Sequence, residues 1–310
     1  MADWLIDYIV TKHDSGITFD DQIRLPIIKK ILQYTIFYQL LIKRKLQPNQ
    51  NFNLKDWLSS NKDVSKYGWL LGLFYFYNIG FDEKEDNSIK SFELFSKAAN
   101  DNYLIAQVYL AKCYYDGRGT TLDHLLAFKY YQESANNGSI IGQFCLGNFY
   151  ESILNNEKES VYWYKKAAKS GNTIAKLHLA NCYRLGKGTE KDEIKAFQYY
   201  ETLANKKIVD AQLKLGDCFY NGIGTKFDSR GAVYWFQKAA EGGYEIVYDN
   251  LAICYELGIG ADIDRTEAFE LYEKSAEKGY INAKFHLGYC YANGIGTKKI
   301  RRKVLNYIMK

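Results

Sequence analysis

The most regular feature of the sequence is a pattern of apolar and polar positions that returns after about 36 residues. It is clearest in the stretch 208–243, where Ala211, Leu215, Cys218 and Phe219 stand at i, i+4, i+7 and i+8. Apolar residues at this spacing occupy one face of an α-helix. The first half of the stretch is therefore predicted to be an amphipathic helix.

A second helix is predicted in the other half of the same stretch. Gly222 ends the first helix, because glycine readily adopts the left-handed backbone conformation found at helix C-termini. Asp228 stands where the next helix begins, and its carboxylate can accept hydrogen bonds from the free backbone N–H groups there. Trp235, Phe236 and Ala239 belong to the apolar positions of that helix. The stretch is thus a helix–turn–helix unit.

Most of the chain consists of such units. Their predicted boundaries are 64–102, 103–138, 139–171, 172–207, 208–243, 244–279 and an incomplete last unit, 280–310. The unit 139–171 is shorter and lacks the glycine turn, and the end from Ile300 to Lys310 is off the pattern. One unit cannot bury its own apolar face, so the units must stack on one another. The predicted fold class is all-α, an α-solenoid of tandem antiparallel helix pairs.

Residues 1–63 do not fit the repeat and form a separate predicted domain. A helix is expected from Ile27 to Lys45, with Pro26 near its start and Pro48 beyond its end. We interpret the domain as an N-terminal helical cap that covers the apolar face of the first unit. A linker or a partner-binding helix is the alternative.

The repeated sequence resembles the Sel-one-like repeat (SLR), a relative of the tetratricopeptide repeat. The clearest copies are GDCFYNGIGT at 216–225 and AICYELGIGA at 252–261, and the resemblance covers about residues 64–310. It implies a right-handed superhelix whose surface binds proteins. Members act as adaptors in signalling and in protein quality control of the endoplasmic reticulum, and some fungal members are attached to kinase domains. This resemblance predicts a scaffold or adaptor.

Charge and hydropathy exclude several other classes of protein. The net charge of +5 is mild for 310 residues and does not suggest the clustered basic face of a nucleic-acid-binding protein, so nucleic acid is not an expected partner. The longest apolar stretch, about 31–42, is too short to span a membrane. Residues 1–11 do not read as a secretory signal, because Asp3 and Asp7 interrupt their apolar run. A cytoplasmic location is expected, and the oligomeric state stays open.

The cysteines follow the repeat. Cys182, Cys218, Cys254 and Cys290 are each 36 residues apart, so each occupies the same place in its unit. Free cysteine behaves as a small apolar residue in such a place, and buried, reduced thiols are expected in preference to disulfides. A cysteine-rich (HCP-like) branch of the family, once linked to penicillin binding, pairs cysteines between consecutive units. Those positions here are mostly alanine, which argues against that pairing.

No residues form a recognisable catalytic set. The repeated Gly-x-Gly loops lack the preceding strand and the third glycine of a phosphate-binding loop, and no histidine stands at metal-ligand spacing from the cysteines. We therefore expect no enzyme activity, no cofactor and no metal site. Two alternatives remain: a hydrolase of the β-lactam-binding, cysteine-rich type, and a regulatory region of a kinase system.

The partner-binding residues are predicted from the positions that vary between units. Unit positions 7, 10 and 14 of the first helix differ in character while their neighbours keep the pattern. They share one helix face, because their spacing is i, i+3 and i+7. First helices commonly line the concave face of stacked repeats, so this face is expected to bind an extended polypeptide. The residues are Tyr109, Lys112, Asp116, His178, Asn181, Leu185, Lys214, Asp217, Asn221, Asn250, Ile253, Leu257, His286, Tyr289 and Asn293.

Overall fold

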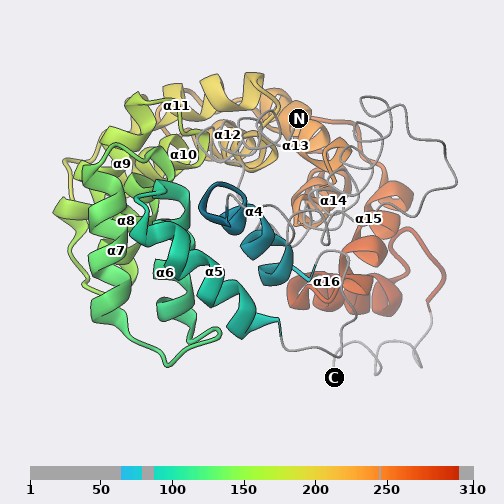
Figure 1. Ribbon diagram of the computed structural model, residues 1–310. Helices are drawn as coiled ribbons and strands as arrows, with labels where there is room; N and C mark the ends of the chain where they lie inside the picture. The colour runs from blue at the N-terminus through green and yellow to red at the C-terminus, as the bar shows by residue number, and fades with distance from the viewer. Residues whose placement is uncertain (1–63, 79–86, 244–245, 300–310) are drawn as a thin grey trace, which may run out of the picture. The chain divides into compact units, whose positions relative to one another are not determined.

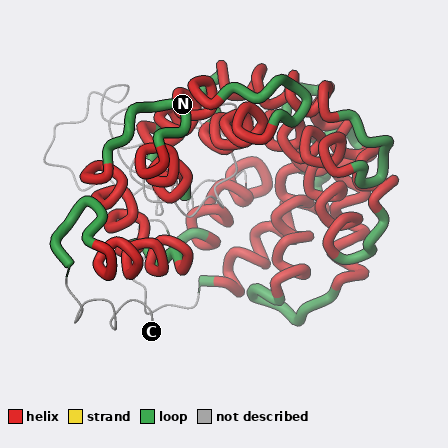
Figure 2. The backbone as a smooth tube through the Cα atoms, turned by 180° about the vertical axis from the view of Figure 1, so that it is seen from behind, coloured by secondary structure: helices red, strands yellow, loops and turns green. Residues whose placement is uncertain are grey.

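Every regular element in the described part of the chain is an α-helix (Figure 2). The computed structural model describes residues 64–78, 87–243 and 246–299. The predicted N-terminal cap, 1–63, and the off-pattern end, 300–310, lie outside these residues. The helices are α4 (Val64–Phe76), α5 (Ser88–Asn100), α6 (Leu104–Asp116), α7 (His124–Asn136), α8 (Ile140–Ser152), α9 (Glu157–Lys169), α10 (Thr173–Leu185), α11 (Glu193–Asn205), α12 (Val209–Asn221), α13 (Ser229–Glu241), α14 (Val247–Leu257), α15 (Arg265–Glu277) and α16 (Ile281–Asn293).

The chain divides into two compact parts, residues 1–179 and 180–310, here called the N-terminal and C-terminal parts. In the N-terminal part, consecutive helices from α4 to α9 pack against each other (Figure 1). In the C-terminal part, consecutive helices from α11 to α16 do the same. Within each of these two runs, a first helix therefore packs on the second helix of its own unit, and that second helix packs on the next first helix. The prediction of an all-α solenoid is confirmed.

Aspartate caps begin the second helices, as the sequence predicts. Asp123, Asp192, Asp228 and Asp264 precede α7, α11, α13 and α15, and each side chain accepts a hydrogen bond from a backbone N–H of the first turn. These bonds satisfy donors that have no partner within the helix. The caps fix where the loop ends and thus how the two helices of a unit meet.

The glycine turns serve two purposes. Gly222 ends α12 in the left-handed conformation, with φ +67°, as predicted. Gly224 also has a positive φ, and a Cβ atom there would overlap the carbonyl group of Glu193 at the start of α11. Gly260 lies in the same way against the carbonyl of Ser229. The second glycine is therefore required because each loop packs tightly on the preceding unit.

Candidate functional site

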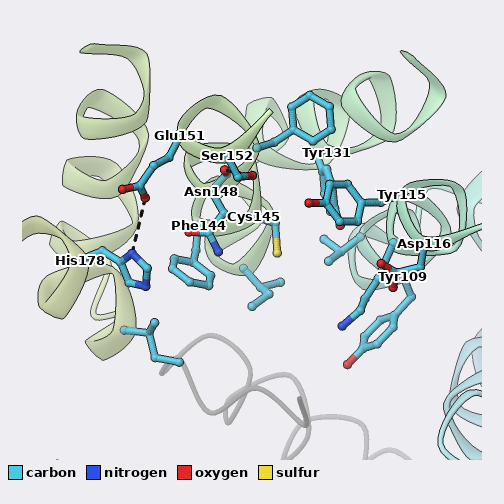
Figure 3. Close-up of a pocket in the computed structure, with 15 residues that line it drawn as sticks. Tyr109, Tyr115, Asp116, Tyr131, Phe144, Cys145, Asn148, Glu151, Ser152 and His178 are labelled. Atoms are coloured by element: carbon cyan, nitrogen blue, oxygen red, sulfur yellow. Dashed lines mark hydrogen bonds and ion pairs between the residues drawn. The ribbon is translucent and has the colours of Figure 1, made fainter. Parts of the chain in front are cut away.

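In the N-terminal part, a groove of about 810 Å³ runs across the first helices α6 and α8 and the first half of α10 (Figure 3). Its floor and walls are mostly apolar and aromatic, and its polar groups stand at the two ends and in the middle. The lining residues are Val108, Tyr109, Lys112, Tyr115, Asp116, Tyr131, Ile141, Phe144, Cys145, Asn148, Phe149, Glu151, Ser152, Ile174 and His178.

The groove contains each residue of the N-terminal part that the sequence predicted to bind a partner. These are Tyr109, Lys112, Asp116 and His178. Asp116 is exposed, and Lys112 and His178 are partly exposed.

Tyr109 differs from the other three, because only 5% of its surface is exposed. Its ring stacks on Phe95 with 5.3 Å between centroids, and its hydroxyl lies 3.3 Å from that of Tyr77. Tyr109 therefore belongs to the core and presents only one edge to the groove.

The sequence prediction missed the middle of the groove. Cys145, Asn148 and Ser152 come from the shorter unit 139–171, which contributes no residue to the predicted set. They stand at the same i, i+3 and i+7 spacing on α8 as the predicted residues do on α6. The signal was therefore present, because the shortening of this unit affects its loop and not its first helix.

Buried tyrosine hydroxyls hold the polar groups of the groove in place. Tyr164 on α9 is fully buried, and its single O–H lies between two acceptors, Asn148 Oδ1 at 2.5 Å and Glu151 Oε2 at 2.6 Å. Glu151 Oε2 also lies 3.8 Å from Nδ1 of His178 on the next first helix (Figure 3). Because both side chains of this pair are more than a third exposed, the pair adds little to stability. It does orient a carboxylate and an imidazole toward the groove.

A related arrangement recurs in the C-terminal part. Tyr272 on α15 donates to Glu256 Oε2 at 2.9 Å, and the ring of His286 stacks on Tyr272 with 4.9 Å between centroids. Burial and the nearby Glu256 carboxylate raise the pKa of Tyr272. The hydroxyl therefore stays protonated and remains a donor to the carboxylate.

A smaller hollow of about 190 Å³ lies between α12, α13 and α14. It brings together four predicted residues, Asp217, Asn221, Asn250 and Ile253. Burial raises the pKa of Asp217, although Lys214 Nζ lies 3.3 Å from its carboxylate and opposes the shift.

The remaining predicted residues do not line either cavity. Asn181 accepts a hydrogen bond from the buried Tyr200 hydroxyl at 2.6 Å, and Lys214 pairs with Asp217. The side chains of Leu185, Leu257 and Tyr289 are exposed on their helices. His286 packs on Tyr272, and Asn293 bonds to the backbone of its own helix. Whether these residues bind a partner stays a prediction.

The cysteines are free thiols, not disulfides. All six are free, and five are buried, as the repeat predicts. Burial raises the pKa of Cys113, Cys218 and Cys290 to about 12, so these thiols carry their proton at neutral pH. A protonated thiol is a poor nucleophile and a poor metal ligand. The cysteine-rich hydrolase stays an alternative that the Ellman assay described below can test.

Two statements apply only to the part of the chain that the structure describes. Among these residues, no three His, Cys, Asp or Glu side chains gather closely enough to hold a metal ion. Likewise, none of the helices from α4 to α16 has the length and apolar character needed to cross a membrane.

Comparison with protein families gives one match that repeats along the chain. The family model described as Sel1 repeat matches seven stretches, residues 69–103, 104–139, 143–172, 173–207, 209–244, 248–280 and 281–302. Together these stretches cover well over half of the chain.

Two curated fungal proteins are similar to part of the chain. Chitin synthase regulator SKT5 of Saccharomyces cerevisiae is 31% identical over 147 residues, which cover 44% of this chain and 21% of the relative. Chitin synthase regulatory factor 4 of Schizosaccharomyces pombe is 31% identical over 106 residues, which cover 34% of this chain and 17% of the relative. The matched region thus spans about a fifth of the length of these relatives.

Solved structures of bacterial proteins share the fold. Protein c5321, a protective antigen of uropathogenic Escherichia coli with an SLR fold, has a TM-score of 0.71 and 28% identity, covering 83% of this chain and 55% of its own. A Sel1 repeat protein from Oxalobacter formigenes has a TM-score of 0.66 and 24% identity, covering 79% of this chain and 71% of its own.

Proposed function

Because this chain belongs to the Sel1 repeat family, we propose that it is a non-catalytic scaffold that binds a polypeptide on the face formed by its first helices. The observation that carries the proposal is the groove across α6, α8 and α10, which contains Lys112, Asp116 and His178 from the predicted binding positions. An apolar groove with a few oriented polar groups is typical of a binding site rather than of a solvated surface.

The names of the fungal relatives point to a class of partner. Both are described as regulators of chitin synthase. We therefore propose an enzyme of chitin synthesis as the first candidate partner, with this chain in a regulatory role. Signalling, protein quality control and a regulatory region of a kinase system stay predictions.

The test is a capture experiment on the whole chain with paired charge variants. Lys112→Ala with Asp116→Ala alters the groove on α6. Lys129→Ala with Glu133→Ala alters α7, where these two side chains form an exposed i,i+4 pair at 3.9 Å. Each double variant removes one cation and one carboxylate from a helix of the same unit, so the two are matched in charge.

The proposal expects a partner that the wild-type chain and the α7 variant retain and that the α6 variant loses. Retention by both variants would place the partner elsewhere on the chain and overturn the groove assignment. Capture of no partner by the wild-type chain, from extracts that contain chitin synthase, would overturn the scaffold role.

A further inference from the structure

One position of the second helix differs between the repeats, and the difference reaches the face of the first helices. Tyr164 on α9 and Tyr200 on α11 each stand eight residues after the cap residue of their helix. Their hydroxyls lie 2.5 Å from Oδ1 of Asn148 and 2.6 Å from Oδ1 of Asn181, both on first helices. In α13 the corresponding residue is Phe236. This repeat therefore lacks a hydroxyl that two other repeats supply from within.

The Phe236 ring has the same place in its repeat as the tyrosine rings have in theirs. A Cβ atom at Gly216 on α12 would overlap the Phe236 ring. In the same way, a Cβ atom at Gly147 on α8 would overlap the ring of Tyr164. Each ring therefore packs directly on the backbone of its first helix. The residue after the glycine is the one that meets the hydroxyl, and on α12 this residue is Asp217.

The hollow of about 190 Å³ between α12, α13 and α14 lies beside this carboxylate. Phe236 is only 2% exposed and forms its floor, whereas Tyr220 and Ile253 are partly exposed and form its accessible apolar sides. Asn221 and Asn250 complete the lining. An apolar cavity of about 150 Å³ is large enough for one benzene ring. The hollow therefore has room for the ring of one side chain.

The charges around Asp217 favour a neutral hydrogen-bond donor. Lys214 Nζ lies 3.3 Å from Asp217 Oδ2. A carboxylate has about four acceptor positions, so the ammonium group leaves room for a further donor. Burial raises the pKa of Asp217, and the positive charges of Lys214 and Arg184 oppose this shift.

Three classes of group are thereby disfavoured in the hollow. A third cation would be repelled by the two that already act on the carboxylate, and an acidic group would be repelled by Asp217 itself. A wholly apolar group would cover the carboxylate without replacing the hydrogen bonds that water makes to it. An aromatic ring that carries a hydroxyl fits both the size of the hollow and its acceptor.

We propose that this hollow binds a tyrosine side chain of the partner, whose hydroxyl donates to Asp217 and whose ring lies between Tyr220 and Ile253. The partner thus supplies the hydroxyl that Phe236 lacks. This inference rests on the proposed function and adds a side chain that the partner presents to the first helices of the C-terminal part.

Two small probes test the proposal on the whole chain. N-acetyltyrosinamide carries the phenol, and its O-methyl derivative keeps the ring and the oxygen but cannot donate a hydrogen bond. Each is titrated into protein labelled with ¹³C at the isoleucine δ1 methyl groups. The methyl of Ile253 reports on the hollow, and that of Ile263, which is 60% exposed and does not line the hollow, reports on non-specific contact.

N-acetyltyrosinamide should shift the Ile253 methyl with a dissociation constant of about 1–10 mM, and the Ile263 methyl should not respond. The O-methyl derivative should bind about fivefold more weakly, because it leaves Asp217 without the donor. Asp217→Ala should weaken the binding of N-acetyltyrosinamide by the same factor. Its matched control is Glu241→Ala, which removes the carboxylate of another i,i+3 lysine pair, at 2.7 Å on α13, and should change nothing.

Phe236→Tyr is a second variant that does not remove any contact. It supplies the hydroxyl from within the repeat, as Tyr200 does for Asn181, and should compete with the probe for Asp217. The binding of N-acetyltyrosinamide should fall about fivefold in this variant. The melting temperature of each variant, followed by circular dichroism, shows that it is folded.

Equal binding of the two probes, or equal responses of the Ile253 and Ile263 methyl groups, would overturn the proposal. A captured partner should be lost from Asp217→Ala and kept by Glu241→Ala, and equal retention would show that the partner does not use the hollow. If N-acetyltyrosinamide does not bind while the α6 double variant still loses a captured partner, the tyrosine inference is wrong and the scaffold proposal stands. If it binds as expected and no partner is captured, the scaffold proposal fails and the chemistry of the hollow stands.

Discussion

The hydroxyl of Tyr164 donates a hydrogen bond to Glu151, with 2.6 Å between the two oxygen atoms. Tyr164 lies in the core between α8 and α9, whereas Glu151 faces the groove. One buried hydroxyl therefore connects the packing of a repeat with the polar surface that the repeat presents. The same relation holds between Tyr272 and Glu256 in the C-terminal part.

Removal of this hydroxyl should cost stability. We expect Tyr164→Phe to lower the free energy of unfolding by about 1 kcal/mol, because a buried hydrogen bond of this kind contributes about that much. The phenyl ring should fit, since Phe236 holds the corresponding place two units later and is buried there. Urea denaturation followed by circular dichroism measures the change.

Tyr162→Phe is the control for this prediction. The Tyr162 side chain lies two residues earlier on α9, is about half exposed, and contacts the Lys166 ammonium through its ring. Its variant should match the wild-type chain within error. A loss of stability in Tyr162→Phe equal to that in Tyr164→Phe would show that the bond to Glu151 contributes nothing specific.

The second glycine of each turn gives a sharper prediction. Gly260→Ala should be more damaging than Gly279→Ala, although both glycines have positive φ values, +74° and +94°. Left-handed backbone costs a non-glycine residue about 1–2 kcal/mol in either place. At Gly260 the new Cβ atom also meets the carbonyl of Ser229, whereas at Gly279 nothing lies within 4 Å. Urea denaturation of the two variants measures the difference, and the midpoint of Gly260→Ala should be the lower one. Equal midpoints would contradict the prediction that the loop of Gly260 packs closely on the helix that begins at Ser229.

Local chemistry explains which features the sequence could predict. The aspartate caps and glycine turns depend on residues within one loop, so Asp228 and Gly222 were identified from their spacing alone. The burial of Tyr109 could not be predicted in this way, because it depends on the rings of Phe95 and Tyr77 in the preceding unit. The irregular sequence of that unit hides its register from a comparison of repeats.

The repeat pattern predicts only some of the residues that line the groove. Positions on α6 and α10 were recognised because their units keep the full 36-residue length. Asn148 is absent from the predicted binding residues because it belongs to the shortened unit 139–171. The orientation of its side chain depends on Tyr164, which belongs to a different helix. A pattern along one helix shows which side chains share a face. It does not show how each side chain is oriented, because the residue that holds it belongs to a neighbouring helix.

The next prediction is that all six cysteines are reduced. All six cysteines should react with Ellman's reagent after denaturation without any reductant, since none is paired. In the folded chain the five buried cysteines should react slowly, and Cys145, which is partly exposed in the groove, should react first. Fewer than six reactive thiols in the denatured chain would indicate disulfides and would favour the cysteine-rich hydrolase alternative.

The same buried thiols should make the protein less stable in alkali. Burial raises the pKa of Cys254 from 9.0 to about 11 and that of Cys290 to about 12. Above pH 9 the unfolded chain loses protons that the folded chain keeps, so ionisation favours unfolding. The stabilisation is complete below pH 9 and falls as the pH rises toward 11 and 12, by up to about 1.4 kcal/mol per pH unit for each thiol.

Urea denaturation at several pH values between 8 and 10.5 measures this slope. Cys254→Ala should flatten it, because one titrating group is removed, even where the substitution lowers stability at every pH. An identical slope in the wild-type chain and in Cys254→Ala would show that the thiol does not contribute.

The last prediction concerns α4, which is buried on every face from residue 68 to residue 76. Trp69, Leu70, Phe74 and Phe76 are all buried, although a helix that packs on one neighbour leaves part of its surface open. Among the described helices, α5 is the main neighbour of α4. A helix that is apolar all round is stable in water only when it is covered all round. We therefore propose that residues 1–63 supply the cover, as the cap interpretation predicts.

Removal of residues 1–63 should lower the melting temperature by about 5 °C or more and increase the binding of a hydrophobic dye such as ANS. Removal of residues 300–310 is the control and should change both quantities less. Unchanged melting and dye binding after removal of residues 1–63 would rule out the cap and favour the linker.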